Sequence, residues 1–101
     1  MTEHAQPMSE QEAQDRLHTL GGGWQLNAAG HLEQRFGFSD FMGAMRFANA
    51  VAEAAEAANH HPDLTITWGM CAVEIWTHDI GGLAEGDFTL AATIGTLYAP
   101  E

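Results

Sequence analysis

The stretch EAANHHPDLTITWGMCAVEIWTH, residues 56–78, decides the predicted fold because its hydrophobic period changes part-way along it. Pro62 disfavours the α conformation in the residue before it, so a helix that enters this stretch is expected to end near Asn59. Apolar and polar residues then alternate over 63–68 and again over 71–78. Alternation with period two is typical of half-buried strands, and the pair GM between the two runs predicts a hairpin.

The residues on either side repeat this pattern of helices and strand pairs. Ser9 and Glu12 form a capping-box pattern, and the glycines at 21–23 stop the helix that it begins. The turn sequence NAAG, between evenly spaced apolar residues, predicts a first hairpin. The predicted elements are a helix over 9–20, two strands within 24–38, a helix from its N-cap Ser39 to Asn59, strands over 63–68 and 71–78, and a helix over 83–97.

This order, α-β-β-α-β-β-α, predicts an α+β fold in which three helices pack on one face of a four-stranded antiparallel sheet. The alternation places Trp68 in the core beside Leu64 and Ile66. The length predicts one domain over 1–101, with 1–8 as a flexible N-terminal tail. The apolar stripe of the second helix, expected to be core or subunit interface, is Phe41, Met45, Ala48, Val51, Ala52, Ala55 and Ala58.

Composition and charge exclude several classes of function. The formal net charge is −11, and all 3 of the fixed cations are arginines, so phosphate backbones and anionic lipid headgroups are repelled. Direct nucleic-acid or membrane binding is therefore not expected. Cys71 is the single cysteine, which excludes an intrachain disulfide or a multi-thiolate metal site and predicts a half-buried strand residue. The N-terminal residues lack a signal-peptide pattern, and a soluble cytoplasmic protein is expected.

Histidines gather at the junction between the second helix and the strand that follows. Glu56 and His60 are four residues apart, so the carboxylate can reach the imidazole on the last helical turn. His61, held extended before the proline, is expected to point elsewhere. His78 ends the last strand, and antiparallel pairing brings that end back beside the histidine pair. Three imidazoles and a carboxylate are therefore expected to share one pocket.

Such a cluster favours proton transfer. Free imidazole has a pKa of about 6.5, so several imidazoles supply both an acid and a base near neutral pH. No serine lies near the cluster and lysine is absent, which disfavours nucleophilic catalysis. A metal site needs convergent nitrogens, whereas neighbouring histidines point apart in an extended chain. Structural roles stay open too, since histidines at a helix end are often dipole partners or surface residues. His4, His18 and His31 are expected to be solvated.

Residues 56–87 also contain a set of side chains at fixed spacing: Glu56, His60-His61-Pro62, Trp68, His78 and Asp87. This set resembles the signature of the pterin-4a-carbinolamine dehydratase family, whose activity is that of 4a-hydroxytetrahydrobiopterin dehydratase. The flanking pieces GFSDFMGAMRFANAVAEAAEAANHHPD and THDIGGLAEGDFTLA are similar to the same family, so the resemblance covers roughly residues 20 to 97.

The resemblance implies the fold given above and an activity. Family members convert 4a-hydroxytetrahydropterin to the quinonoid dihydropterin and water, which recycles the pterin used by an aromatic amino acid hydroxylase. No metal or organic cofactor is implied. The resemblance implies catalytic roles for His60, His61 and His78. The implied substrate contacts are Asn59, His60, His61, Trp76, Thr77, His78 and Asp79.

We assign roles within that resemblance as hypotheses. His60 and His78 exchange acid and base duties across the pterin, His61 holds the ring, and Glu56 orients His60. Asp87, in the first turn of the last helix, is expected to be structural: it caps backbone N–H groups and fixes the loop after the last strand.

Two positions depart from the family pattern. Ala84 stands where members usually have a serine or threonine N-cap, a loss of about 1 kcal/mol unless Asp87 compensates. Trp76 stands where a small hydroxyl residue is common, and its indole narrows the pocket if it points inward. Trp68 is large enough to stack on a pterin, although core packing is the expectation given its neighbours.

The family also contains a different class of function. Its animal members act as dimerisation cofactors of a homeodomain transcription factor, and some bacterial members belong to molybdopterin metabolism. An interaction-only protein would depend on the stripe from Phe41 to Ala55 and tolerate loss of its histidines, whereas an enzyme would show the reverse. The resemblance implies a homodimer or homotetramer, with an edge strand and the second helix as contacts.

Overall fold

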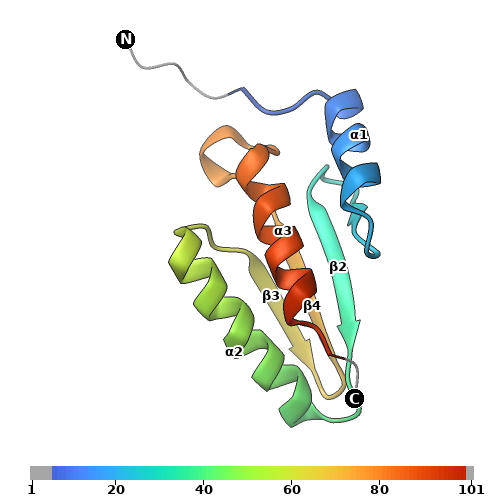
Figure 1. Ribbon diagram of the computed structural model, residues 1–101, viewed down its shortest axis with the longest axis vertical. Coiled ribbons are helices and arrows are strands. Elements are labelled where there is room, and N and C mark those ends of the chain that lie inside the picture. The colour runs from blue at the N-terminus through green and yellow to red at the C-terminus, as the bar shows by residue number, and fades with distance from the viewer. Residues whose placement is uncertain (1–5, 100–101) are drawn as a thin grey trace.

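Three helices and four antiparallel strands follow one another in the order that the sequence predicts, which confirms the α+β fold class. The computed structural model describes residues 6–99 (Figure 1). The elements are α1 (Glu10–Leu20), β1 (Gln25–Leu26), β2 (Leu32–Gly37), α2 (Phe41–Ala58), β3 (Asp63–Thr67), β4 (Met70–Ile75), the 3₁₀ turn η1 (His78–Ile80) and α3 (Glu85–Leu97).

The strands form one open sheet in the order β1-β2-β4-β3. Leu32 pairs with Ile75 between β2 and β4, and Leu64 pairs with Val73 between β3 and β4. Because side chains alternate along a strand, these residues share one face of the sheet. Helices α2 and α3 cover one face of the sheet, and α1 packs beside α3 near the edge of the sheet that β1 forms (Figure 1).

The core lies between this sheet face and the helices. Its largest fully buried apolar side chains are Leu32, Phe36, Val51, Val73, Ile75 and Ile94. Each such side chain contributes about 1.5 to 3 kcal/mol through burial. Cys71 is fully buried in β4 rather than half-buried, and burial raises the pKa of its thiol. The cysteine is therefore a packing residue at neutral pH.

The helix ends follow local sequence, with one correction. Ser9 caps α1 with the predicted capping box, since its hydroxyl accepts from the Glu12 N–H and the Glu12 carboxylate accepts from the Ser9 N–H. The predicted N-cap of α2, Ser39, is wrong by one residue: Asp40 Oδ1 accepts from the Gly43 N–H at 2.7 Å. A carboxylate both caps the helix and complements the positive end of its dipole.

One core prediction was wrong, and the predicted stripe of α2, expected to be core or subunit interface, is buried only in part. Trp68 is 75% exposed, because it lies in the turn between β3 and β4, where the alternation has ended. On α2, Phe41 is 49% exposed and Ala52 and Ala58 are also exposed. The buried face instead centres on Phe47, whose ring packs 4.7 Å from that of Phe36. The buried residues of α2 are Gly43, Ala44, Phe47, Ala48, Val51 and Ala55.

The predicted flexible tail at 1–8 falls mostly outside the described residues, and its flexibility stays a prediction. At the end of that segment, the N–H of Met8 donates to the carbonyl of Leu83 at 2.8 Å. This bond joins the entry to α1 to the loop before α3. Within residues 6–99, no helix combines the length and the apolar character required to cross a bilayer.

Candidate active site

The first wall of the candidate site is made by the C-terminal end of α2. Asn59 takes the left-handed conformation, with φ 50° and ψ 46°, which asparagine tolerates better than most residues. Its N–H donates to the carbonyl of Glu56 at 3.1 Å, and the N–H of His60 donates to the carbonyl of Ala55 at 3.0 Å. This pair of bonds is a Schellman motif, which ends the helix and turns the chain out of its spiral at the histidine pair.

The second wall follows β4. Thr77 is extended and forms an isolated bridge with Gly82, to whose carbonyl its N–H donates at 2.8 Å. Because β3 and β4 are antiparallel, the segment before β3 and the segment after β4 lie side by side. A pocket of about 230 Å³ opens between them. Its lining residues are Asn59, His60, His61, Thr77, His78 and Asp79.

Asp87 contacts groups from three segments of the site. Its carboxyl group is completely buried, and Oδ1 lies 2.5 Å from His60 Nε2. Oδ2 accepts from the Thr77 hydroxyl and from the Ala84 N–H, each at 2.7 Å. The second bond holds the N-terminal turn of α3, where Ala84 has no hydroxyl to serve as a cap. The expected capping role of Asp87 is therefore present, together with a contact to His60 that the sequence did not predict.

The expected pairing of Glu56 with His60 is wrong. Glu56 Oε2 instead lies 2.6 Å from His61 Nε2, and both side chains are exposed, by 76% and 59%. The reason is the left-handed residue Asn59, which removes His60 from the helical geometry that would have placed it above Glu56. The adjacent imidazoles thus contact different carboxylates, one exposed and one buried.

These contacts assign tautomers to two of the imidazoles. An ionised carboxylate only accepts, so the Nε2 atoms of His60 and His61 carry the protons that are donated to Asp87 and Glu56. In each neutral ring, Nδ1 is then the basic nitrogen. Within residues 6–99, neither Nδ1 atom makes a hydrogen bond to protein. The arrangement therefore provides two proton acceptors whose partner carboxylates would stabilise the protonated ring.

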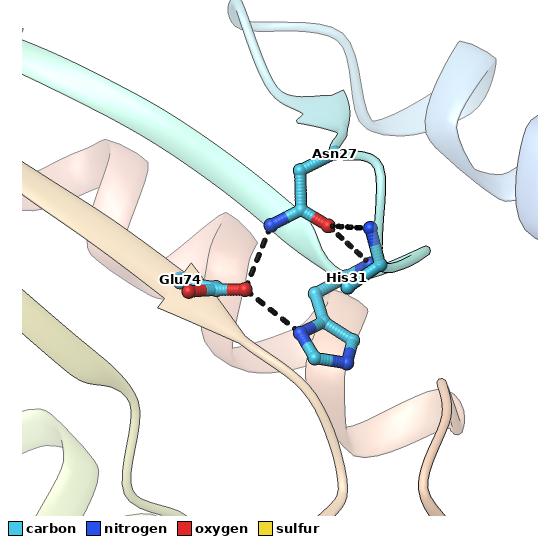
Figure 2. Close-up of polar contacts among 4 residues, drawn as sticks. Asn27, His31 and Glu74 are labelled. Carbon is cyan, nitrogen blue, oxygen red and sulfur yellow. Dashed lines mark hydrogen bonds and ion pairs between the residues drawn. The ribbon is translucent and has the colours of Figure 1, made fainter.

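His78 and Trp76 are placed differently. The two rings stack with centroids 4.2 Å apart and planes 5° from parallel. Trp76 does not line the pocket, so the implied substrate contact of its indole stays a prediction. The other face of the indole stacks on His31, which the sequence had suggested to be simply solvated. That expectation is wrong, because His31 Nδ1 also contacts Glu74 Oε2 at 2.8 Å, as Figure 2 shows.

A larger cavity, of about 520 Å³, lies elsewhere, between the N-terminal segment, the turn after β1 and the loop before α3. Among its lining residues only Glu10 has an ionisable side chain. Because proton transfer needs titratable groups, we place the candidate site at the smaller histidine-lined pocket.

Comparison with known proteins shows the family of this chain. Residues 6–97 match the family model described as pterin 4 alpha carbinolamine dehydratase. The chain belongs to the pterin 4 alpha carbinolamine dehydratase family. A relative from Rickettsia bellii (strain OSU 85-389) is 50% identical over 91 residues, which is 90% of this chain and 80% of the relative. One from Methylococcus capsulatus is 45% identical over 94 residues, 92% and 82% of the two chains. Both relatives are named provisionally as pterin-4-alpha-carbinolamine dehydratases.

Solved structures of other proteins share the fold. A crystal structure from Brucella melitensis, described as a transcriptional coactivator/pterin dehydratase, superimposes with a TM-score of 0.84 at 28% identity. The superposition covers 92% of this chain and 99% of the Brucella melitensis chain. A pterin dehydratase-like protein, described as a RuBisCO assembly factor in the alpha-carboxysome, gives a TM-score of 0.65 at 18% identity and covers 78% and 93%. The second likeness concerns the fold alone.

Proposed function

We propose that this protein is a pterin-4a-carbinolamine dehydratase, a hydro-lyase that releases water from a 4a-hydroxytetrahydropterin. Family membership supports the substrate class. The observation that carries the proposal is the gathering of His60, His61 and His78 around one pocket, with His60 in contact with the buried Asp87. Dehydration needs an acid at the leaving hydroxyl and a base at the neighbouring N–H group, and imidazoles supply both near neutral pH.

The reaction breaks one carbon–oxygen bond and moves two protons. The C4a–O bond breaks and the oxygen leaves as water after gaining a proton. N5 loses its proton, and the electrons of that N–H bond form the C4a=N5 double bond of the quinonoid dihydropterin. No oxidant or reductant is consumed, so two proton-transferring groups are sufficient.

We assign His60 as the base and His78 as the acid. His60 would accept the N5 proton at Nδ1, because its Nε2 is already directed at Asp87. The buried carboxylate would then stabilise the imidazolium, as the aspartate of a catalytic triad does for the histidine that it orients. The ring of His78 makes no side-chain hydrogen bond within residues 6–99, so it is free to protonate the leaving hydroxyl. His61, tethered to Glu56, would hold the pterin.

The remaining lining residues suit the polar edge of a pterin. The Asp79 carboxylate accepts hydrogen bonds, as needed for the ring N–H and amino groups, and Asn59 both donates and accepts. The Thr77 hydroxyl already donates to Asp87, so it would offer only lone pairs to a ligand. The small pocket fits a fused bicyclic ring better than a long chain.

The test is the rate of quinonoid dihydropterin formation from enzymatically generated carbinolamine, in a coupled assay with chelator present. We expect the wild-type chain to accelerate the reaction and a His60→Ala, His78→Ala double variant to lose at least about 10²-fold. His18→Ala, an exposed histidine of α1 outside the pocket, is the matched control. A wild-type rate equal to that of buffer would overturn the proposal for this pterin.

The cellular part of the proposal follows from the family. The product would return to an aromatic amino acid hydroxylase in the cytoplasm, and the chain would act as a homodimer or homotetramer. Sedimentation equilibrium tests the assembly. Co-purification with a hydroxylase from the same cells tests the coupling.

A second candidate function is a non-catalytic interaction or a molybdopterin-related binding role. It is favoured by four large apolar side chains that are exposed: Phe41, Met42, Trp68 and Leu97. Exposed apolar side chains of this size are common at protein interfaces. Under this alternative, a Phe41→Ser, Met42→Ser variant would lose its partner while a His60→Ala, His78→Ala variant would keep it.

A further inference from the structure

Three aromatic rings form a stack beside the pocket. The indole of Trp76 lies between the imidazoles of His31 and His78, with centroid distances of 4.1 Å and 4.2 Å. The planes deviate from parallel by only 6° and 5°. Both faces of the indole are therefore covered by imidazoles, and a pterin could stack on it only by displacing one of them.

The sheet register builds this stack. Leu32 of β2 pairs with Ile75 of β4, so His31 and Trp76 lie across from each other one position beyond the paired residues. The chain stays extended through Thr77, with φ −93° and ψ 107°. Because side chains alternate in an extended segment, Trp76 and His78 leave it on the same side. Two strands thus bring together residues that are 45 positions apart in sequence, from 31 to 76.

The outer end of the stack is anchored by hydrogen bonds. Glu74 Oε2 accepts from Asn27 Nδ2 at 2.7 Å and from His31 Nδ1 at 2.8 Å (Figure 2). Asn27 Oδ1 in turn accepts from the backbone N–H groups of Ala29 and His31, each at 3.0 Å. The His31 side chain is only 15% exposed. Its ring is therefore a fixed support for the indole.

The inner end of the stack is held by ring contact alone. His60 and His61 are each oriented by a carboxylate, whereas the His78 ring makes no hydrogen bond within residues 6–99. Stacking fixes the plane of an imidazole and leaves both of its nitrogens, which lie in that plane, free to meet a ligand. For a proton donor this has the advantage that no nitrogen is used for orientation.

We propose that Trp76 is a positioning residue for His78, and that His31 supports Trp76 from the opposite face. The inference rests on the proposed function, in which His78 protonates the leaving hydroxyl. Loss of the indole would let the His78 ring rotate, which impairs the chemical step more than substrate binding. In this proposal Trp76 does not contact the substrate itself. It holds the His78 ring, which does.

The kinetic test compares Trp76→Leu with Trp76→Phe. We expect Trp76→Leu to lower kcat by about 10- to 100-fold and to leave KM within about twofold of wild type. Trp76→Phe, which keeps an aromatic face, should retain kcat within about threefold. The matched control is Trp68→Leu, an exposed tryptophan in the turn between β3 and β4. Equal kcat values for Trp76→Leu and Trp68→Leu in an active enzyme would overturn the proposal.

A spectroscopic test separates this inference from the proposed function. Ring currents of the indole should shift the His78 ring protons upfield in the NMR spectrum of the full chain, with the signals identified by their loss in His78→Gln. The shift should disappear in Trp76→Leu and persist in Trp76→Phe. If the wild-type chain has no dehydratase activity but shows this shift, the proposed function fails and the positioning stands. Ordinary His78 shifts in the wild type would overturn the positioning whatever the activity.

A second variant covers the case in which Trp76→Leu does not fold. His31→Ala removes the support from outside the pocket and leaves the indole in place. We expect a smaller upfield shift of the His78 protons and a kcat lowered by about threefold to tenfold. Wild-type values for both quantities would contradict the role of His31.

Discussion

His60 and Asp87 are in contact at 2.5 Å, Nε2 to Oδ1, across 27 positions of sequence. The same carboxyl group accepts from the Thr77 hydroxyl and the Ala84 N–H. One buried side chain therefore holds an imidazole of the pocket, the segment after β4 and the first turn of α3. Substitutions of Asp87 should therefore affect both the stability of the fold and the rate of the proposed reaction.

Asp87→Ala should lower the free energy of unfolding by about 2 to 4 kcal/mol, because it leaves the part-buried donors of His60, Thr77 and Ala84 without their partner. Asp87→Asn keeps the size but places an NH₂ group against one of the same donors, so kcat should still fall by about 10²-fold. Thermal melting and the dehydratase assay measure the two effects. Full activity in Asp87→Asn would show that the carboxylate does not orient His60.

Glu56→Gln should be far milder. The pair of Glu56 and His61 is exposed, and exposed ion pairs contribute less than about 1 kcal/mol. The contact between His60 and Asp87 does not involve Glu56, so kcat should fall less than in Asp87→Asn. Comparing the two variants side by side in the same assay checks this. A larger loss of kcat in Glu56→Gln than in Asp87→Asn would favour the pairing of Glu56 with His60 that the sequence suggested.

Asn59 should be replaceable by glycine but not by alanine. Its positive φ costs most residues about 1 kcal/mol or more, while glycine adopts it freely. Asn59→Ala should therefore lower the melting temperature by about 4 to 8 °C, since the chain is of a size at which 1 kcal/mol has that effect. Asn59→Gly should melt close to wild type. Similar melting of both variants would mean that the end of α2 adjusts without strain.

Glu74 should stabilise the fold in a pH-dependent way. The hydrogen bond from His31, and then that from Asn27, hold the pKa of Glu74 below its ordinary value. A carboxyl with a lowered pKa in the folded state contributes stability above its unfolded pKa of about 4.3, and that contribution disappears as pH falls through the lower folded value. The melting-temperature difference between wild type and Glu74→Gln should thus be present at pH 7 and shrink near pH 3. A difference of equal size at both values would contradict this origin.

Local signals predicted the elements well. The capping box of Ser9 is a contact within one helical turn, and Pro62 disfavours helical conformation at His61, just beyond the end of α2. Both helix ends can therefore be inferred from neighbouring residues. Trp68 was misplaced for a physical reason. Alternation marks which residues share a face, but it does not mark where the strand stops and the turn begins.

The site was predictable as a location and less so as a set of contacts. Antiparallel pairing was enough to bring His78 back to the histidine pair. The partner of His60 was not predictable from spacing, because Asn59 leaves helical geometry and the true partner comes from α3. The support given by His31 depends on the pairing of Leu32 with Ile75, a register that no local pattern determines.

The two neighbouring histidines differ in how the surrounding solution reaches them. Counter-ions screen an interaction between exposed groups, and at about 0.15 M salt the screening length is about 8 Å. They have little access to a carboxylate that is completely buried. Rising ionic strength should therefore loosen His61 from Glu56 while leaving His60 bound to Asp87, so adjacent residues of one pocket would respond to salt independently.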